Sequence, residues 1–364
     1  MQGGSWWGPL HAFVAGTVLA AISGATQLFT ITWAAAAPPL RSTSISQRWA
    51  LAVGIGLVLI GMATDIPWLV AVGAIIAVVA LGVLAAILVG AVRRSLLRRF
   101  DLSSRFYLLG LGAGAAGITL GGLMGSEMAG SWYSDIRLVH SHLNFVGLVG
   151  LTIIGTLPTI LPTFAHHKIV SGQEARVGWW LAVLSVGLMG AGLVAGEASV
   201  GLGTLAAAGS LTVILVGIVG RLGRRGLKGG LAYYQVVLGS LWLVLWAVID
   251  GLRLIGGSAT APFSRWTAAV VTAGVGQVLL GSFAYLLPVL AGKPPRLGRN
   301  LERAIRRPWL PLITANLAGV GFLTEAPEVA IALTAAWLLD FGYRLVRFEW
   351  RDGSGDRPGD QPIA

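Results

Sequence analysis

The chain has 364 residues, of which 55% are apolar and only 11% charged, and its mean hydropathy is +0.78. Soluble globular proteins carry about 25% charged residues, so this composition excludes an ordinary water-soluble domain. The absence of cysteine excludes disulfides, thiolate metal ligands, iron–sulfur clusters and cysteine nucleophiles. The net charge of +11 indicates membrane topology and lipid contact rather than a nucleic-acid partner, because the basic residues gather in loops between apolar runs.

Apolar runs of the length that crosses a bilayer predict an all-α, polytopic transmembrane helical bundle of about eleven spans, within a range of about 10–12. In chain order the spans are 10–36, 49–64, 67–92, 105–125, 137–162, 177–196, 198–220, 231–256, 266–291, 309–324 and 327–348. The second and tenth have about 16 residues, which is short against the usual ~20.

The distribution of basic residues predicts an external N-terminus, an internal C-terminus and a location in the plasma membrane. With this orientation 23 of the 26 Lys and Arg residues are internal, and only Arg137, Arg253 and Arg265 are external. The first apolar run lacks a basic segment before it and is too long for a signal peptide, so we expect it to be retained. We expect residues 1–350 to form one transmembrane domain and 351–364 a disordered cytoplasmic tail.

Histidines are the most informative polar residues, because burying a polar group at membrane depth is costly and indicates function. Three of the five begin spans on the external side: His11 opens the first span, and His140 and His142 lie one turn into the fifth. His166 and His167 lie at the opposite, internal end of the fifth span, where we expect a hydrated interface.

The His-x-His spacing restricts what His140 and His142 can do. Residues two apart on an α-helix are separated by about 200° around the axis and about 3 Å along it, so both rings cannot chelate one ion from a regular helix. We expect His140 to share a face with Asn144, and His142 to point to the opposite side. Each imidazole would then serve a different neighbouring site, as a two-centre haem protein requires. Two alternatives stay open: one histidine only forms hydrogen bonds, or a π-bulge swings both rings to one side.

The residues after His11 and His142 repeat at the same offsets of 5, 11 and 13. They are Gly16, Ile22 and Gly24 in the first span, and Gly147, Ile153 and Gly155 in the fifth. This repetition predicts that His11 and His142 lie at similar depth, where they could be the axial ligands of one haem. The glycine-rich run 110–125 predicts either close helix packing or a surface for a flat cofactor.

The run LVHSHLNFVGLVGLTIIGTLPTILPTF (Leu138–Phe164) resembles a span of the NnrS-like and heme–copper-oxidase-subunit-I-like membrane proteins. His11–Phe29 and Gly276–Gly292 resemble other spans of that group. The resemblance implies ligation of haem b by His142 and His140, with His11 as a further ligand. Spans 6 to 11 contain no histidine, so the additional copper ligands of full oxidases are missing and a complete haem–copper centre is not expected.

The first hypothesis is a haem-binding integral membrane redox protein that handles electrons or a small diatomic such as nitric oxide or oxygen. His11 and His142 would ligate one haem, His140 would face a second haem or a metal such as copper, and Asn144 would orient a ligand. Arg253 would hold a haem propionate, or would pair with Asp250 three residues earlier. Whether such a protein is an oxidoreductase is left open.

Two alternatives belong to other classes. One is a metal or proton-coupled transporter that uses His11, His140, His142 and Glu127 as a transient copper or proton site. The other is a non-catalytic partner subunit of a copper-dependent respiratory or nitrite/nitric oxide system, which would meet a copper protein or electron donor on the outer face. Elsewhere in the chain, Asp340 is expected to pair with Arg344 four residues later.

Overall fold

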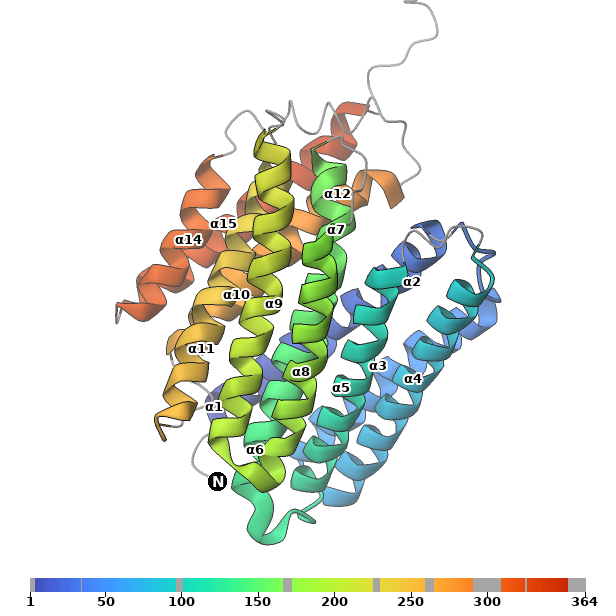
Figure 1. Cartoon of the computed structure of the whole chain (residues 1–364), viewed down its shortest axis with the longest axis vertical. Helices are drawn as coiled ribbons and strands as arrows, with labels where there is room; N and C mark the ends of the chain where they lie inside the picture. The colour runs from blue at the N-terminus through green and yellow to red at the C-terminus, as the bar shows by residue number, and fades with distance from the viewer. Residues whose placement is uncertain are drawn as a thin grey trace, which may run out of the picture. The chain divides into compact units, whose positions relative to one another are not determined.

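A computed structural model describes residues 4–33, 35–95, 101–165, 172–224, 230–258, 265–290, 309–324 and 326–352. Within these ranges every regular element is a helix, which confirms the all-α prediction (Figure 1). His166, His167 and the tail from residue 353 lie outside the described residues.

Nine helices in the described part of the chain are long and apolar enough to cross a membrane. They are Trp7–Trp33, Arg41–Ala63, Pro67–Arg93, Leu102–Gly125, Gly130–Phe164, Gln173–Ala195, Glu197–Arg224, Leu231–Ile255 and Arg265–Leu286. The protein is therefore a multi-pass membrane protein. α14 (Trp309–Leu323) is short, as predicted for the tenth span, and α15 (Pro327–Asp352) follows it.

The second span differs from its predicted length. Its helix, α3 (Arg41–Ala63), has 23 residues rather than about 16, because the polar stretch before Trp49 is already helical. Ser44 and Gln47 in that stretch are buried and form hydrogen bonds to the preceding span. Partners within the protein thus allow polar residues to extend the helix.

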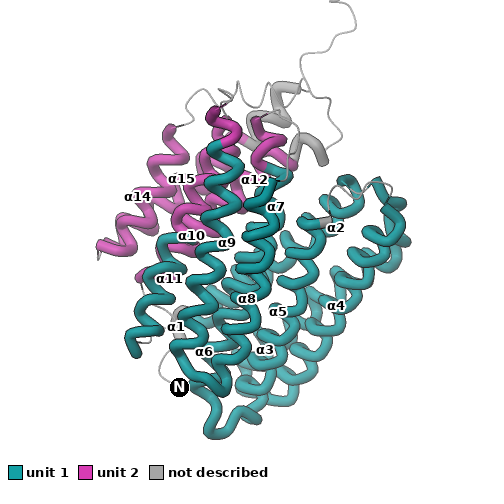
Figure 2. Tube along the Cα trace, viewed as in Figure 1, with its two compact units in different colours: residues 1–160, 169–220, 244–262 teal, residues 161–168, 221–243, 263–364 magenta. Residues whose placement is uncertain are grey.

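Two compact units make up the chain (Figure 2). Unit 1 contains residues 1–160, 169–220 and 244–262, and unit 2 contains residues 161–168, 221–243 and 263–364. The predicted single domain over 1–350 stays a prediction.

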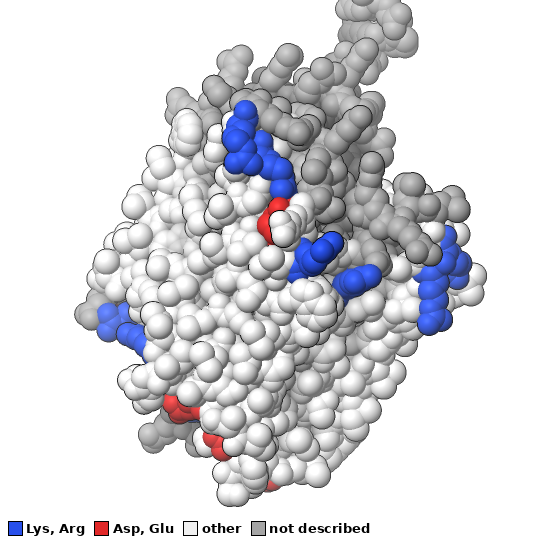
Figure 3. All heavy atoms as spheres, in the orientation of Figure 1, with Lys and Arg blue, Asp and Glu red and all other residues white. Residues whose placement is uncertain are grey.

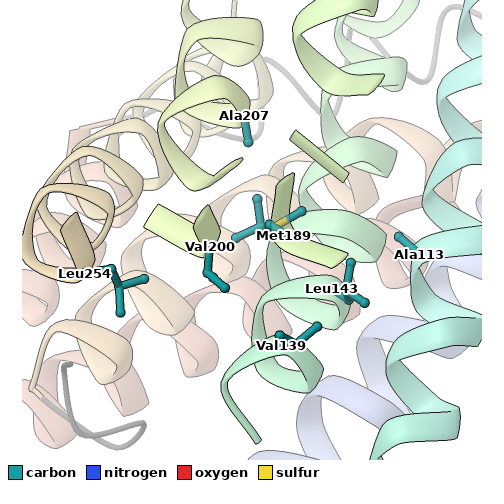
Figure 4. Close-up of a cluster of buried hydrophobic side chains, with 8 residues drawn as sticks. Ala113, Val139, Leu143, Met189, Val200, Ala207 and Leu254 are labelled. Carbon is teal, nitrogen blue, oxygen red and sulfur yellow. The ribbon is translucent and has the colours of Figure 1, made fainter. Parts of the chain in front are cut away.

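The core of unit 1 is an apolar cluster to which five spans contribute (Figure 4). Its buried residues are Ala113, Val139, Leu143, Val146, Met189, Val200, Ala207 and Leu254. They come from α5 (Asp101–Gly125), α6 (Tyr133–His142), η4 (Leu143–Gly150), α8 (Gln173–Ala195), α9 (Glu197–Arg224) and α10 (Leu231–Ile255). The segment that carries the His-x-His pair therefore contributes Val139, Leu143 and Val146 to this cluster.

The fifth span is the most deeply buried of the nine. Protein buries 78% of its most apolar window, against 28–50% for the others. A span that other helices surround can carry polar side chains without exposing them to lipid. By contrast, most of the described surface in Figure 3 belongs to uncharged residues, and Trp49 and Trp68 are examples of exposed aromatic side chains. This surface is suited to lipid contact.

Three of the nine spans contain a π-helical segment with glycine at its fifth position. These are η1 (Ala12–Val18), η4 (Leu143–Gly150) and η5 (Val270–Gly276), in the first, fifth and ninth spans. The first two begin directly after His11 and His142. The repeated glycine spacing after these histidines therefore coincides with a shared backbone feature, and π-helical turns are frequent at functional sites.

Candidate cofactor site

Two histidines from the first and fifth spans face each other in unit 1. His11 ends α1 (Gly4–His11), and His140 lies on α6. Their ring centroids are 6.4 Å apart and their planes differ by 11°. Both side chains are half-buried.

A backbone carbonyl fixes the orientation of each ring. His11 Nδ1 lies 3.0 Å from the Trp7 carbonyl oxygen, and His140 Nδ1 lies 2.7 Å from that of Gly117. Because a carbonyl oxygen can only accept a hydrogen bond, each Nδ1 carries the proton and each Nε2 keeps its lone pair. No described residue forms a hydrogen bond with either Nε2. This is the tautomer in which a histidine binds a metal through Nε2.

Neighbouring side chains support this arrangement. The Trp7 ring stacks on His11 with a centroid distance of 4.2 Å. Asn144 donates from Nδ2 to the His140 backbone carbonyl at 2.8 Å. This bond joins the end of α6 to η4 beside the histidine. Asn144 therefore positions His140 in this structure, and its predicted role in orienting a ligand stays a prediction.

Glycines of α5 make room for the fifth span. A Cβ built on Gly121 would lie 2.5 Å from His140 Cε1, and one on Gly117 would collide with the Asn144 amide. A Cβ on Gly114 would meet Leu148 at 2.7 Å. Of the two roles predicted for this glycine run, close helix packing is the one found at these three positions.

The second histidine of the pair has different partners. His142 Nε2 lies 2.8 Å from Asp250 Oδ2 on α10, and His142 Nδ1 lies 2.9 Å from the Leu138 carbonyl oxygen. His142 and Asp250 are only 6% and 4% exposed. The Trp246 ring lies 6.3 Å from the His142 ring. Both ring nitrogens of His142 are thus engaged, and neither offers a lone pair to a metal in this conformation.

The structure pairs the histidines differently from the sequence-based expectation. We predicted that His11 would pair with His142, but the ring that faces His11 is that of His140. The two rings of the His-x-His pair do lie on opposite sides, as predicted, since His140 contacts α5 and His142 contacts α10. The π-helical segment begins after His142, so both histidines sit on regular helix and the π-bulge does not bring their rings together.

The predicted charged residues lie on two other helices, α10 and α15. Arg253 is exposed at the end of α10, while Asp250 on the same helix binds His142. The predicted pair of Asp340 and Arg344 is confirmed, with 2.6 Å between Oδ2 and Nε. The described residues contain no group of three or more His, Asp or Glu side chains that could hold a metal ion. A role for Arg253 with a propionate stays a prediction.

Two buried polar groups were not predicted as clusters. In unit 2, Asn316 Oδ1 accepts a hydrogen bond from Trp242 Nε1 at 2.8 Å, and Asn316 lies beside Gln277, which directly follows η5. In unit 1, Gln27 and Gln47 bond to each other across two spans. The sequence signal for the second group is the helical spacing of Ser23 and Gln27 within the first span.

No protein-family model matches the chain, and no curated protein matches it.

Proposed function

We propose that this protein is a haem-binding integral membrane redox protein in which His11 and His140 are the axial ligands of a b-type haem. The observation that carries the proposal is the pair of nearly parallel rings with centroids 6.4 Å apart. Two imidazoles that bind one metal ion through Nε2 at about 2 Å, from opposite sides, have centroids about 6 Å apart. We also propose that the protein is related to the NnrS-like and haem–copper oxidase subunit I-like membrane proteins.

The small number of protein ligands at this site favours haem over a bare metal ion. Protein zinc sites use three or four protein ligands, whereas haem brings four nitrogen donors of its own and needs only axial ligands. His11 and His140 supply two donors, and the described residues offer no third at this position. A bound haem would supply one-electron transfer, or binding of a diatomic such as nitric oxide or oxygen. Copper held by His11 and His140 is the weaker alternative.

Neighbouring residues fix the tautomer and the orientation of the two imidazoles in a form that can bind a metal. The Trp7 and Gly117 carbonyls select the tautomer that leaves Nε2 unprotonated, so no proton has to leave before a metal binds. Trp7 limits rotation of the His11 ring by stacking on it, and Asn144 fixes the backbone next to His140. Gly121 allows the His140 ring to lie close to α5.

The proposal includes the topology. We propose eleven spans in the plasma membrane, with the N-terminus outside and the C-terminus inside, on the basis of the 23 internal basic residues. In this orientation His11 and His140 lie near the outer surface. An electron donor on that side, such as a copper protein, could then exchange electrons with the site.

One observation favours a second candidate function. His142 and Asp250 form a buried pair of ionisable groups between two spans, and such pairs are typical of ion and proton pathways in transporters. A proton-coupled or metal-coupled transporter is therefore the alternative. It predicts a colourless protein in which the pair, rather than His11 and His140, carries the activity.

The optical spectrum of the purified protein tests the haem proposal. Protein produced with an adequate haem supply should show a Soret band and the spectrum of a low-spin, six-coordinate haem. The variants His11→Ala and His140→Ala should each lose the six-coordinate signature, whereas His142→Ala should retain it. A folded, colourless wild-type protein would refute the proposal, and stoichiometric copper in that protein would favour transport.

A further inference from the structure

A group of buried polar side chains lies between the first three spans of unit 1, apart from the histidines. Ser23, Gln27 and Thr30 lie at helical spacing on α2 (Leu19–Trp33), with Ser44 and Gln47 on α3. None is more than 8% exposed. Between this group and His11, the buried residues of the first span are apolar: Val18, Leu19 and Ile22.

Hydrogen bonds connect four of these side chains. Ser44 Oγ donates to Gln27 Oε1 at 3.0 Å, and Gln27 Nε2 donates to Gln47 Oε1 at 3.1 Å. Ser23 Oγ donates to the same Gln47 oxygen at 2.9 Å. Gln47 Nε2 donates to the Ala80 carbonyl of α4 (Pro67–Arg93) at 3.3 Å. These bonds join three helices.

The hydrogen bonds above leave part of the donor capacity of this group unused. A glutamine amide has two N–H donors, and the contacts above use one from Gln27 and one from Gln47. Thr30 Oγ1, in a residue only 1% exposed, has no hydrogen-bond partner. Three donors are therefore left without an acceptor among the described residues. Leaving buried donors unsatisfied is unfavourable, and buried groups of this kind are usually satisfied by ordered water.

We propose that these residues form a water-binding site that opens toward the ends of the helices at Trp33 and Arg41. Water supplies the missing acceptors for Thr30, Gln27 and Gln47. The buried side chains of this group carry no charge, and the nearby Arg41 and Arg48 are exposed, so a neutral ligand such as water fits the group. Thr30 is one turn from the end of α2, and the loop 35–40 beyond it is largely exposed. Water has a short path into the site from that end.

Cysteine reactivity tests the site directly, because the natural chain contains no cysteine. A thiol reacts as the thiolate, which forms where water reaches it. Thr30→Cys should therefore react with a small maleimide in detergent solution. Ala91→Cys is the matched control: Ala91 is also 1% exposed, and it packs in an apolar cluster with Ala36 and Ile31, the residue next to Thr30. We expect Thr30→Cys to react at least tenfold faster.

Equal rates in two folded variants would overturn the proposal. Size-exclusion profiles and thermal unfolding establish folding, and if Thr30→Cys does not fold, Ser44→Cys takes its place with the same expected rate ratio. The measurement needs no haem. A colourless protein with a reactive Thr30→Cys would therefore refute the proposed function and leave the water site supported.

Discussion

Replacing Asp250 by alanine tests the pair that links α6 to α10. The substitution leaves His142 Nε2 without its 2.8 Å partner in a residue only 6% exposed. A hydrogen bond to a charged group contributes about 1.5–3 kcal/mol, and removing one member of a fully buried ion pair costs about 3–5 kcal/mol. Measured interactions between membrane helices are weaker than these, about 0.6 kcal/mol on average with a maximum near 1.7. We therefore expect Asp250→Ala to lower the free energy of unfolding by about 1–2 kcal/mol.

Denaturant titration of the purified protein in detergent measures this loss. Asp250→Asn should be less destabilised than Asp250→Ala, because the asparagine oxygen can still accept a hydrogen bond from His142. The exposed Glu328→Ala serves as a control and should stay within about 0.5 kcal/mol of the wild type. An Asp250→Ala variant as stable as this control would refute the reasoning.

The same variant separates the two histidine environments. If haem is held by His11 and His140, Asp250→Ala should keep the low-spin spectrum at temperatures where the variant is folded. Loss of the Soret band from folded Asp250→Ala would mean that His142 belongs to the cofactor site. The pairing proposed here would then be wrong.

Three further predictions concern packing, the residues His166 and His167, and topology. Gly121→Ala should lower the unfolding free energy by about 1–3 kcal/mol, because the added Cβ would collide with the His140 ring. Gly112→Ala is the control: its Cβ would meet no atom within 4 Å, so the variant should be neutral or more stable by up to about 1 kcal/mol in the same titration. Replacing His166 and His167 by alanine should leave haem content measured by pyridine haemochrome unchanged, because the sequence predicts this pair at the opposite end of the fifth span, about a membrane thickness (~30 Å) from the proposed site. Haem loss in this variant would place the site on the wrong side. In intact cells an impermeant maleimide should label Ser131→Cys but not Gly298→Cys, and the opposite pattern would reverse the orientation.

The polar groups show why part of the site could not be predicted. The opposite faces of His140 and His142 follow from a two-residue spacing on one helix, which is local information. The contact between His142 and Asp250 joins residues 108 positions apart. From the sequence, the expected partner of Asp250 was Arg253, since a partner three residues away on the same helix can be recognised without a fold.

The sequence by itself determined that this is an all-helical, multi-pass membrane protein, and it pointed to His11, His140 and His142 as the candidate site. Hydropathy, helical periodicity and charge placement are properties of short segments, and a bilayer requires such segments to be helical. Only the tertiary structure decided that His140 rather than His142 faces His11, and that α3 begins at Arg41. Both outcomes depend on which helices pack together, because a buried polar side chain is stable only where another span brings it a partner.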